Sequence, residues 1–307
     1  MKIAIHDRPG SYSDQWIIYS TKNKIPYKVV NAYDTDIIEQ LSDCNAFVWH
    51  HSHADYRDKL FAKQLLYSVE AKGLKVFPDS NTTWHFDDKV GQKYLFESLG
   101  IATPQTYVFY DKEHALQWAE CADFPKVFKL RGGAGAANVR LVRTKKDAYH
   151  LIAKAFGTGF PQYNQIGGLR ERIYQFKKGK DSLLGIAKGV GRLIIPTKFS
   201  KIIGNEKGYV YFQDFIQNDG FDYRLEVCGD RAIAMVRYVR SGDFRASGGH
   251  NDVFDKSLIE KDVLDLGFAT VNKLKMQSAA LDIVRDNITK KLYVEEVSYC
   301  YALDEDE

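Results

Sequence analysis

Strand-like and helix-like patterns of apolar residues alternate along the first 80 residues. The predicted strands are residues 2–5, 27–30, 46–49 and 74–77. The predicted helices are residues 11–22, residues 34–41, and a longer segment that carries Leu60, Leu65, Leu66 and Val69 and ends at Gly73. This alternation with short links predicts a parallel sheet with helices on both faces. Ligands of such sheets bind at the carboxyl ends of the strands.

The remaining residues predict lobes of mixed composition. Residues 87–100 have helical spacing, with Asp87 as the N-cap, Gly100 as the end, and Val90, Tyr94 and Leu95 on one face. Further strands are predicted at 126–130, 139–142, 210–216, 224–227, 232–239, 279–285 and 291–298. Further helices are predicted at 145–156 and near 258–275, whereas residues 157–208 are irregular and indicate no chemistry. The predicted class is therefore α/β, with α+β lobes after residue 80.

Composition narrows the function classes. The chain has 307 residues, of which 45% are hydrophobic and 13% aromatic, so two or three lobes with large cores are expected and disorder is excluded. The formal net charge of +3 is too small to indicate a basic surface that binds nucleic acids. There is no apolar run of the roughly 20 residues that span a bilayer, and the first residues lack the apolar core of a signal peptide. The four cysteines are scattered. We expect a soluble, reduced, cytoplasmic protein without zinc or disulfides.

A glycine-rich hairpin follows one of the predicted strands. Lys129 ends the strand, and Gly132, Gly133 and Gly135 lie in the turn before the next strand. Glycines let backbone N–H groups approach anionic oxygens closely, and a lysine adds a positive charge. Walker A and Rossmann loops are followed by a helix, so a flap over phosphates fits this hairpin better. An ordinary flexible hairpin is the alternative.

Lys89 lies in the first turn of a predicted helix, after Asp88. The helix dipole disfavours a cation at this end, and a bound anion would offset that cost. The alternative interpretation is a solvated surface lysine, which by itself is the commoner case.

The final predicted hairpin carries acidic residues on one face. Asp282 lies in an otherwise apolar strand, and Glu296 and Ser298 share one face of the next strand, whereas Glu295 takes the other. A carboxylate in such a strand is costly unless it is paired or binds a metal. Mg²⁺ prefers oxygen ligands of this kind. We therefore favour a metal site at Asp282 and Glu296 and a solvated surface acid at Glu295.

Two more groups of polar residues stand out. Arginines on neighbouring strands can clamp a carboxylate or phosphate, although each one alone is more often a salt-bridge residue. These are Arg224, Arg237, Arg240 and Arg245. The second group, His50, His51 and His53, follows a buried strand at its carboxyl end. A substrate contact is favoured there over a metal site, with a plain loop as the remaining alternative.

The ordered series of motifs resembles the ATP-grasp superfamily, and in particular its amino-acid ligase branch, which includes the ribosomal-protein glutamate ligase. The resemblance covers about residues 78–300. The motifs that carry it are, in order, Asp88-Lys89, residues 100–104, residues 125–129 with the glycine flap, residues 213–216, residues 222–224, residues 242–245, residues 281–283 and residues 296–298. The family usually has Asn where Ser298 stands, and only nine residues follow the last strand.

The resemblance implies a role for each matching position. Lys89 and Lys129 resemble the two phosphate-binding lysines, with Gly132, Gly133 and Gly135 in the flap. The adenine-binding segment between the lobes corresponds to Gln213, Asp214 and Phe215, and the residue near the ribose to Asp222. Residues facing the phosphates correspond to Arg245, Ala246 and Ser247, and the catalytic arginines to Arg224, Arg237 and Arg245. The magnesium ligands correspond to Asp282 and Glu296, with Ser298 in the position of the third.

The implied protein is an ATP- and Mg²⁺-dependent carboxylate–amine ligase that forms an amide through an acyl phosphate. Its implied domains are an N-terminal α/β domain at 1–84, a central lobe at 85–212 and a C-terminal lobe at 213–307. The substrates would be an amino acid, a peptide or a uronic acid of a surface glycan. The association of similar chains with envelope polysaccharide pathways favours the last of these. A homodimer is a candidate assembly. The alternatives are a phosphotransferase with a hydroxyl acceptor and a non-catalytic nucleotide-binding module.

Overall fold

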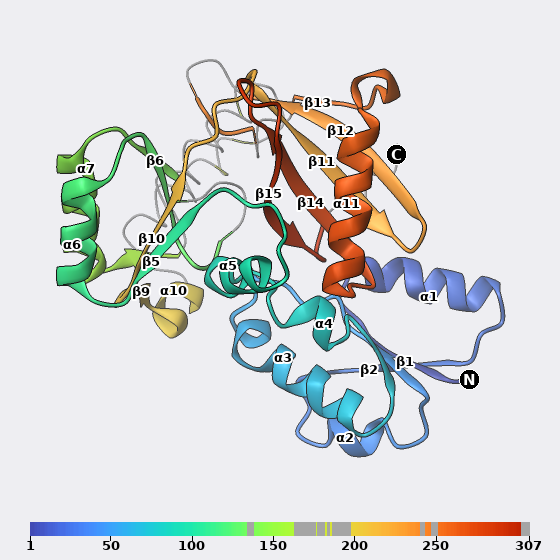
Figure 1. Ribbon diagram of the computed structural model, residues 1–307. Helices are drawn as coiled ribbons and strands as arrows, with labels where there is room; N and C mark the ends of the chain where they lie inside the picture. Colours follow the sequence, from blue (N-terminus) through green and yellow to red (C-terminus); the bar gives the residue numbers. More distant parts are fainter. Residues whose placement is uncertain are drawn as a thin grey trace.

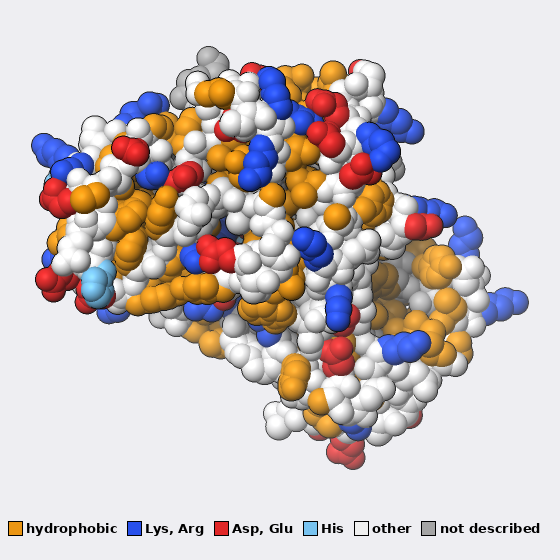
Figure 2. All heavy atoms as spheres, in the orientation of Figure 1, with side chains coloured by type: hydrophobic (Ala, Val, Ile, Leu, Met, Phe, Trp, Pro, Cys, Tyr) orange, Lys and Arg blue, Asp and Glu red, His pale blue; other side chains and the backbone are white. Residues whose placement is uncertain are grey.

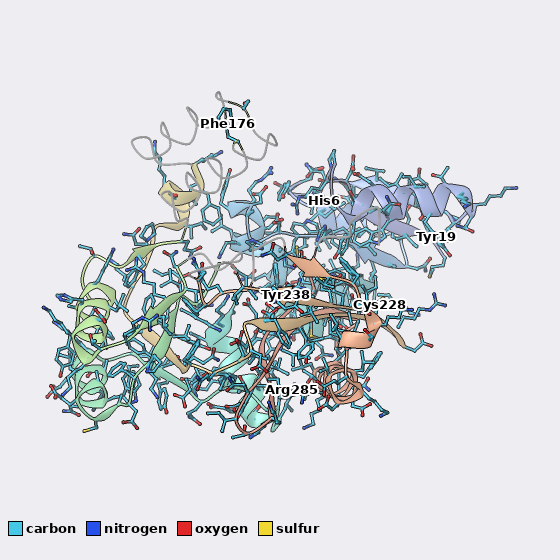
Figure 3. All side chains as sticks on the ribbon, turned by 90° about the horizontal axis from the view of Figure 1, so that it is seen from above. His6, Tyr19, Phe176, Cys228, Tyr238 and Arg285 are labelled. Carbon is cyan, nitrogen blue, oxygen red and sulfur yellow. The ribbon has the colours of Figure 1, made fainter. Side chains whose placement is uncertain are left out.

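The computed structural model describes residues 1–133, 138–162, 176, 182, 185, 198–239, 243–246 and 251–301. Three larger sheets organise these residues, one in each of three lobes (Figure 1). Seen from above in Figure 3, the helix labelled at Tyr19 lies on the same side of the molecule as the strand that ends at Cys228, and the central lobe lies on the other side. Among the described residues, no helix is long and apolar enough to cross a membrane.

The N-terminal sheet is parallel with strand order β2-β1-β3-β4, as the alternating pattern predicts. Its strands are β1 (Ile3–His6), β2 (Tyr27–Val30), β3 (Ala46–Val48) and β4 (Lys75–Phe77). Its helices are α1 (Tyr12–Lys22), α2 (Ile37–Gln40) and α3 (Tyr56–Ala71). Leu65 and Val69 of α3 are buried, whereas Leu60 is 55% exposed. At 100° per residue, Leu60 points well away from the face that Leu65 occupies.

The central sheet is antiparallel with order β5-β10-β6-β7. Its strands are β5 (Thr106–Phe109), β6 (Lys126–Lys129), β7 (Arg140–Val142) and β10 (Val210–Asp214). One face packs against α6 (Lys112–Cys121) and α7 (Lys145–Ala155) in an apolar cluster that includes Phe128 and Phe212. Helix α6 was not predicted from the sequence, and its sequence signals are the N-cap Asp111 and the buried Ala115 and Ala119. Nearby lie β8 (Phe160–Pro161), α10 (Lys198–Ile203) and β9 (Asn205–Glu206).

The C-terminal sheet has order β13-β12-β11-β14-β15 and is antiparallel throughout. Its strands are β11 (Phe221–Cys228), β12 (Arg231–Tyr238), β13 (Asp252–Val253), β14 (Ser278–Arg285) and β15 (Leu292–Ser298), and η1 (Lys256–Leu258) and α11 (Lys261–Leu274) precede β14. Tyr223, Leu225 and Val227 pack in the cluster that holds α11. Because side chains alternate along a strand, Asp222 and Arg224 lie on the opposite face.

Residues 80–98 form α4 (Ser80–Thr83) and α5 (Lys89–Ser98). The N-cap of α5 is Asp88, whose carboxylate accepts from the Gly91 N–H, so the prediction of Asp87 was wrong. Lys89, Gln92 and Phe96 form the buried face of this helix. Of the predicted face, Leu95 packs against the C-terminal core and Val90 is half-buried, whereas Tyr94 is exposed. Polar contacts bury the lysine and the glutamine, and hydrophobicity does not indicate such contacts. Phe96 packs in the C-terminal cluster, although it lies within the 85–212 segment.

On the face of the molecule that Figure 2 shows, basic and acidic side chains are interspersed among apolar ones, with no stripe of one sign.

Candidate active site

One row of charged side chains crosses four strands of the C-terminal sheet, on the face away from α11. Arg237 of β12 lies opposite Asp222 of β11, Arg224 of β11 lies opposite Asp282 of β14, and Asp282 lies opposite Glu296 of β15. The prediction that the acidic side chains share one face is confirmed by this register. Glu295 has no partner in the register, because β15 bulges there. Bulges of this kind are common beside active sites, where they redirect a side chain.

The arginines neutralise the carboxylates of this row. Arg237 forms a bidentate pair with Asp222, with both N–O distances 2.7 Å, and a longer contact of 3.1 Å with Asp282 Oδ1. Arg224 donates to the same Oδ1 atom at 2.7 Å and to Glu226 at 3.2 Å. Burial alone would raise the pKa of Asp282, but the guanidinium groups of Arg237 and Arg224 outweigh it and lower this pKa well below the ordinary value. Asp282 is therefore an ionised carboxylate at neutral pH.

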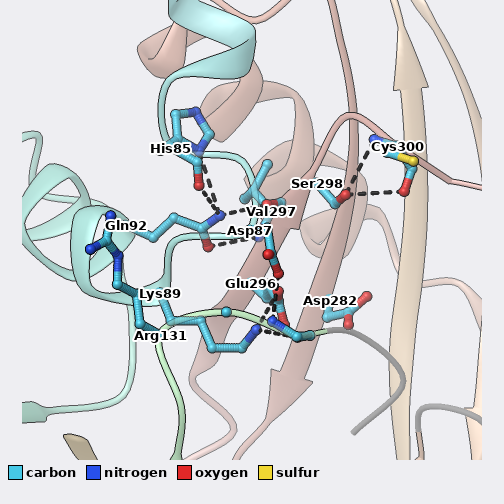
Figure 4. Close-up of polar contacts among 12 residues, drawn as sticks. His85, Asp87, Lys89, Gln92, Arg131, Asp282, Glu296, Val297, Ser298 and Cys300 are labelled. Carbon is cyan, nitrogen blue, oxygen red and sulfur yellow. Dashed lines mark hydrogen bonds and ion pairs between the residues drawn. The ribbon is translucent and has the colours of Figure 1, made fainter. Parts of the chain in front are cut away.

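Lys89 joins this row from α5, as Figure 4 shows. Its ammonium lies 2.8 Å from Glu296 Oε1 and 2.9 Å from the Gly133 carbonyl, and the residue is only 6% exposed. The interpretation of Lys89 as a solvated surface lysine is therefore wrong. Burial opposes the charged form, but the carboxylates of Glu296 and Asp87 raise the pKa of Lys89 above its ordinary value. The lysine is a fixed cation beside the predicted metal ligands.

Asp282 and Glu296 fit a hard divalent cation. Only Oδ1 of Asp282 and only Oε1 of Glu296 have basic partners among the described residues. One oxygen of each carboxylate is thus left for a metal. The described residues contain no group of three or more His, Cys, Asp or Glu side chains arranged to hold a metal ion. Mg²⁺ usually takes one or two protein carboxylates and completes its shell with water and phosphate oxygens, so two carboxylates such as Asp282 and Glu296 match its preference.

Ser298 is engaged elsewhere. Its hydroxyl donates to the Cys300 carbonyl at 3.1 Å and accepts from the Cys300 N–H at 3.2 Å. This local turn occupies the hydrogen and one lone pair of the hydroxyl, so Ser298 offers a metal less than a free hydroxyl would.

The glycine-rich hairpin binds carboxylates through its backbone. The N–H groups of Arg131 and Gly132 donate to Glu206, and the Gly133 N–H donates to Asp87 at 2.6 Å. The approach is close, since a Cβ on Gly132 would lie 3.1 Å from Asp87 Oδ2, Glu206 Oε1 and Lys59 Nζ. These N–H groups therefore already donate hydrogen bonds to anionic oxygens, as a flap over phosphates requires. Gly135 lies outside the described residues.

Lys59, Asp87 and Glu206 are site residues that the pattern analysis missed. Asp87 has a left-handed backbone with φ 53°, and its carboxylate bridges the Gly133 N–H and Lys59 Nζ, which is 2.7 Å away. Lys59 comes from α3, so it links the N-terminal domain to the flap. No motif indicated these residues, because their contacts join segments far apart in sequence.

Lys129 is the second predicted phosphate-binding lysine, and it is buried in the central sheet. It lies opposite Tyr211 of β10 and is 7% exposed. Phe128 and Leu130 pack in the core below the sheet, so Lys129 faces the other side. No hydrogen bond or ion pair joins its ammonium to the part of the chain that the structure describes.

The interlobe segment shows one buried acceptor. The Gln213 Nε2 donates to the Thr106 hydroxyl at 3.1 Å, and that hydroxyl donates to the Pro104 carbonyl at 2.9 Å. This chain of donors fixes the amide orientation and leaves Gln213 Oε1 buried, without a partner among the described residues. Asp214 pairs with Lys126 at 2.6 Å, and the ring of Phe215 lies 6.2 Å from that of Phe244.

The remaining predicted residues are less tightly grouped. Arg245 pairs with Asp243 at 2.6 Å, and Ala246 is buried. Arg240 and Ser247, like most of 157–208, lie outside the described residues.

Two of the three predicted histidines, His50 and His51, are buried in the N-terminal domain, whereas His53 is half-buried and lies near the charges of Asp87 and Lys59. His51 is buried against Thr83, with 2.6 Å between Nε2 and Oγ1, and His50 lies 3.1 Å from the Cys300 sulfur. Burial is the largest factor lowering the pKa of His50 to about 4 and that of His51 well below its ordinary value, so both are neutral at pH 7.

Solved structures share this architecture along nearly the whole chain. A RimK domain ATP-grasp protein from Sphaerobacter thermophilus matches with a TM-score of 0.58 and 15% identity, over 99% of this chain and 92% of that one. D-alanine–D-alanine ligase from Bacillus anthracis, solved with ATP, matches with a TM-score of 0.58 and 13% identity, over 98% and 86%. N5-carboxyaminoimidazole ribonucleotide synthetase from Thermotoga maritima matches with a TM-score of 0.56 and 15% identity, over 97% and 68%.

These likenesses confirm the predicted fold, and the chain has an α/β ATP-grasp fold. No protein-family model matches the sequence, and no curated protein matches it significantly.

Proposed function

We propose that this chain is an ATP- and Mg²⁺-dependent carboxylate–amine ligase. The observation that carries the proposal is the arrangement of its buried lysines. Lys129 is buried without an anionic partner among the described residues, and Lys89 is held against Glu296, beside a second ionised carboxylate at Asp282. One buried cation beside two carboxylates and a second at the base of the glycine-rich flap fit the phosphates of a magnesium nucleotide.

The nucleotide would lie between the central and C-terminal sheets. Gln213 Oε1 offers a buried acceptor to the amino group of adenine, with Asp214 and Phe215 beside it. Asp222 would lie near the ribose. The flap N–H groups of Arg131 and Gly132 would bind phosphate oxygens in place of Glu206. Mg²⁺ at Asp282 and Glu296 would offset the charge on the phosphates.

The proposed reaction has two steps. A substrate carboxylate attacks the γ-phosphorus of ATP, the bond to the bridging oxygen of ADP breaks, and an acyl phosphate forms. An amine then attacks the acyl carbon, phosphate leaves, and the amine loses a proton to give the amide. Lys129 and the arginines Arg224, Arg237 and Arg245 would stabilise the charge that develops. The flap would keep water from the acyl phosphate.

Several further assignments belong to the same proposal. The substrates are an amino acid, a peptide or a uronic acid of a surface glycan. The domains are 1–84, 85–212 and 213–307, the location is cytoplasmic, and the candidate assembly is a homodimer.

A Lys129→Met variant tests the proposal. We expect ATP consumption, measured with a panel of amino acids, peptides and sugar acids, to fall by about 100-fold or more because charge stabilisation is lost. Lys93→Met is the matched control, since Lys93 of α5 pairs with Glu97 and lies over the ring of Tyr94. A product lighter by one water than its two precursors would identify the ligase. Equal turnover by Lys129→Met and the wild type would contradict the proposal.

A non-catalytic nucleotide-binding module is the second candidate, because the Ser298 hydroxyl is engaged by Cys300. Magnesium-dependent ATP binding without turnover of any acceptor would favour it. Phosphate found on a hydroxyl acceptor, with no amide formed, would instead identify a phosphotransferase.

A further inference from the structure

Arg8 follows β1 in the N-terminal domain, and the surrounding backbone holds it in place. The Ser13 hydroxyl accepts from the Arg8 N–H and donates to the Arg8 carbonyl, both at 3.0 Å. Ser13 itself is fully buried in the first turn of α1. These two bonds fix the direction in which the Arg8 side chain leaves the backbone.

The guanidinium of Arg8 has a backbone partner and, among the described residues, no ion-pair partner. One of its N–H groups donates to the His50 carbonyl at 2.8 Å, and the residue is half-buried. Among the residues that the structure describes, no carboxylate forms an ion pair with it. Half-buried arginines are usually compensated by an anion, and the planar guanidinium binds carboxylate and phosphate groups through paired hydrogen bonds.

The position of Arg8 in the sheet is one that binds ligands. β1 pairs with β2 on one side and with β3 on the other, so the strand order reverses at β1. The loops that follow β1 and β3 therefore leave the sheet in opposite directions, which is the arrangement that places a ligand crevice at the carboxyl ends of the strands in open α/β sheets. Arg8 lies in the first of these loops and His50 in the second.

The His50 side of this site is neutral, whereas the carboxylates of Asp55 and Asp58 lie within range of the Arg8 charge. The Tyr12 N–H donates to His50 Nδ1 at 3.2 Å, so the ring hydrogen is on Nε2 and points to the Cys300 sulfur at 3.1 Å. The ring also stacks on Tyr12, with 3.8 Å between centroids. Burial lowers the pKa of His50 to about 4, so Arg8 rather than His50 supplies positive charge there.

The His50 side of this site also connects Arg8 to the candidate active site. Cys300 hydrogen-bonds Ser298, and Ser298 lies on the same face of β15 as Glu296, two residues away, which is roughly 7 Å along a strand. A small substrate held at Arg8 would therefore reach the row of charges on the C-terminal sheet.

We infer that Arg8 anchors an anionic group, a carboxylate or a phosphate, of the substrate whose carboxylate the proposed ligase activates. The group would lie between the loops after β1 and β3. This group is separate from the carboxylate that the proposed ligase would activate, so the substrate class is a small molecule with two anionic groups. The identity of the molecule as a ligase substrate rests on the proposed function, whereas anion binding at Arg8 does not require catalysis.

The test is an NMR titration of the arginine Nε–H resonances of the full-length protein. The probes are succinate, inorganic phosphate and, as the neutral analogue, succinamide. We expect a saturable shift of the Arg8 resonance with succinate or phosphate and none with succinamide. In Arg8→Gln the apparent affinity for the anion, measured by calorimetry, falls by about tenfold or more. Arg57→Gln leaves it unchanged, because Arg57 is an exposed arginine of the same domain that pairs with Asp55. Arg8→Lys keeps the charge and retains part of the affinity.

The two probes distinguish the two sources of the anion, since a carboxylate site prefers succinate and a phosphate site prefers phosphate. No saturable shift with either probe, or equal affinity in wild type and Arg8→Gln, would overturn the inference. Magnesium–ATP consumption is measured separately on the same proteins. An Arg8 shift in a protein that binds no ATP would support anion binding at Arg8 and contradict the proposed function. ATP consumption with no Arg8 shift would support the proposed function and contradict anion binding at Arg8.

Discussion

Lys89 and Glu296 are 207 residues apart in the chain, and Lys89 Nζ lies 2.8 Å from Glu296 Oε1. This pair joins the first turn of α5 to the last strand of the C-terminal sheet. It also places a cation beside a proposed magnesium ligand, so the positions of both side chains are set before any nucleotide binds. Such preorganised charges are the main means by which proteins assist phosphoryl transfer.

Glu296→Gln should abolish nucleotide turnover while the protein stays folded. The amide still accepts a hydrogen bond from Lys89, but it loses the charge that would attract a metal. We expect at least about a 100-fold loss of ATP consumption and cooperative thermal unfolding as in the wild type.

The neighbouring Glu295→Gln is the matched control, because Glu295 lies in the bulge without a partner across the sheet. We expect it to retain ATP consumption. An equally large loss of ATP consumption in Glu295→Gln would contradict the specific role of Glu296. It would show that turnover depends on negative charge at either position of this strand.

Glu206→Gln should tighten magnesium–ATP binding. The Glu206 carboxylate occupies the N–H groups of Arg131 and Gly132, so it competes with the phosphates that would bind there. A neutral amide competes less well, because hydrogen bonds to charged acceptors are about twice as strong as neutral ones. Titration calorimetry should show a Kd that is several-fold lower.

Glu120→Gln serves as the control for that change, since Glu120 pairs with Lys145 on the far side of the central lobe. A weaker nucleotide complex in Glu206→Gln would mean that Glu206 holds the flap in its binding position rather than competing with the ligand.

The stability of the protein should fall between pH 7.5 and pH 5 because of buried neutral histidines. Burial is the largest factor lowering the pKa of His85 from 6.5 to about 4. The unfolded chain therefore takes up a proton in this window that the folded chain does not, and acid favours unfolding. For His85 alone the loss by pH 5 is about 2 kcal/mol.

Urea denaturation of His85→Gln at both pH values measures this contribution. The difference in the free energy of unfolding between pH 7.5 and pH 5 should shrink by about that amount. His114→Gln, at an exposed position on α6, should leave the difference unchanged. An unaltered pH dependence in His85→Gln would show that this histidine is protonated in the folded protein.

Gly267→Ala should destabilise the C-terminal lobe without changing nucleotide affinity. A Cβ at this position of α11 would lie 2.0 Å from Leu225 Cδ2, so the fully buried Leu225 side chain or the elements around it must shift. Overpacking of this kind costs about 1–3 kcal/mol, which urea denaturation would detect. Asn272→Ala, on the exposed side of the same helix, should change the stability by less than about 0.5 kcal/mol.

Local periodicity was enough to predict most of the elements. Alternation of strands and helices over residues 1–80 predicted the parallel sheet, because each short apolar block has to be buried on both faces. The separation of two residues predicted that Glu296 and Ser298 share a face of the strand. The helix at 112–121 escaped the pattern analysis, because its buried positions are small alanines that give a weak apolar signal.

The sequence by itself thus determined the α/β class, the positions of the lysines and acids that carry the candidate chemistry, and the resemblance to the ATP-grasp fold. Only the tertiary structure decided which charges meet. The pairing of Lys89 with Glu296, the double arginine contact of Asp282 and the contacts of Asp87 with Lys59 and Gly133 all join distant segments. Residue spacing carries information only about neighbours along a helix or strand. Contacts between lobes depend on how whole sheets pack, and that is settled by the cores of all three lobes together.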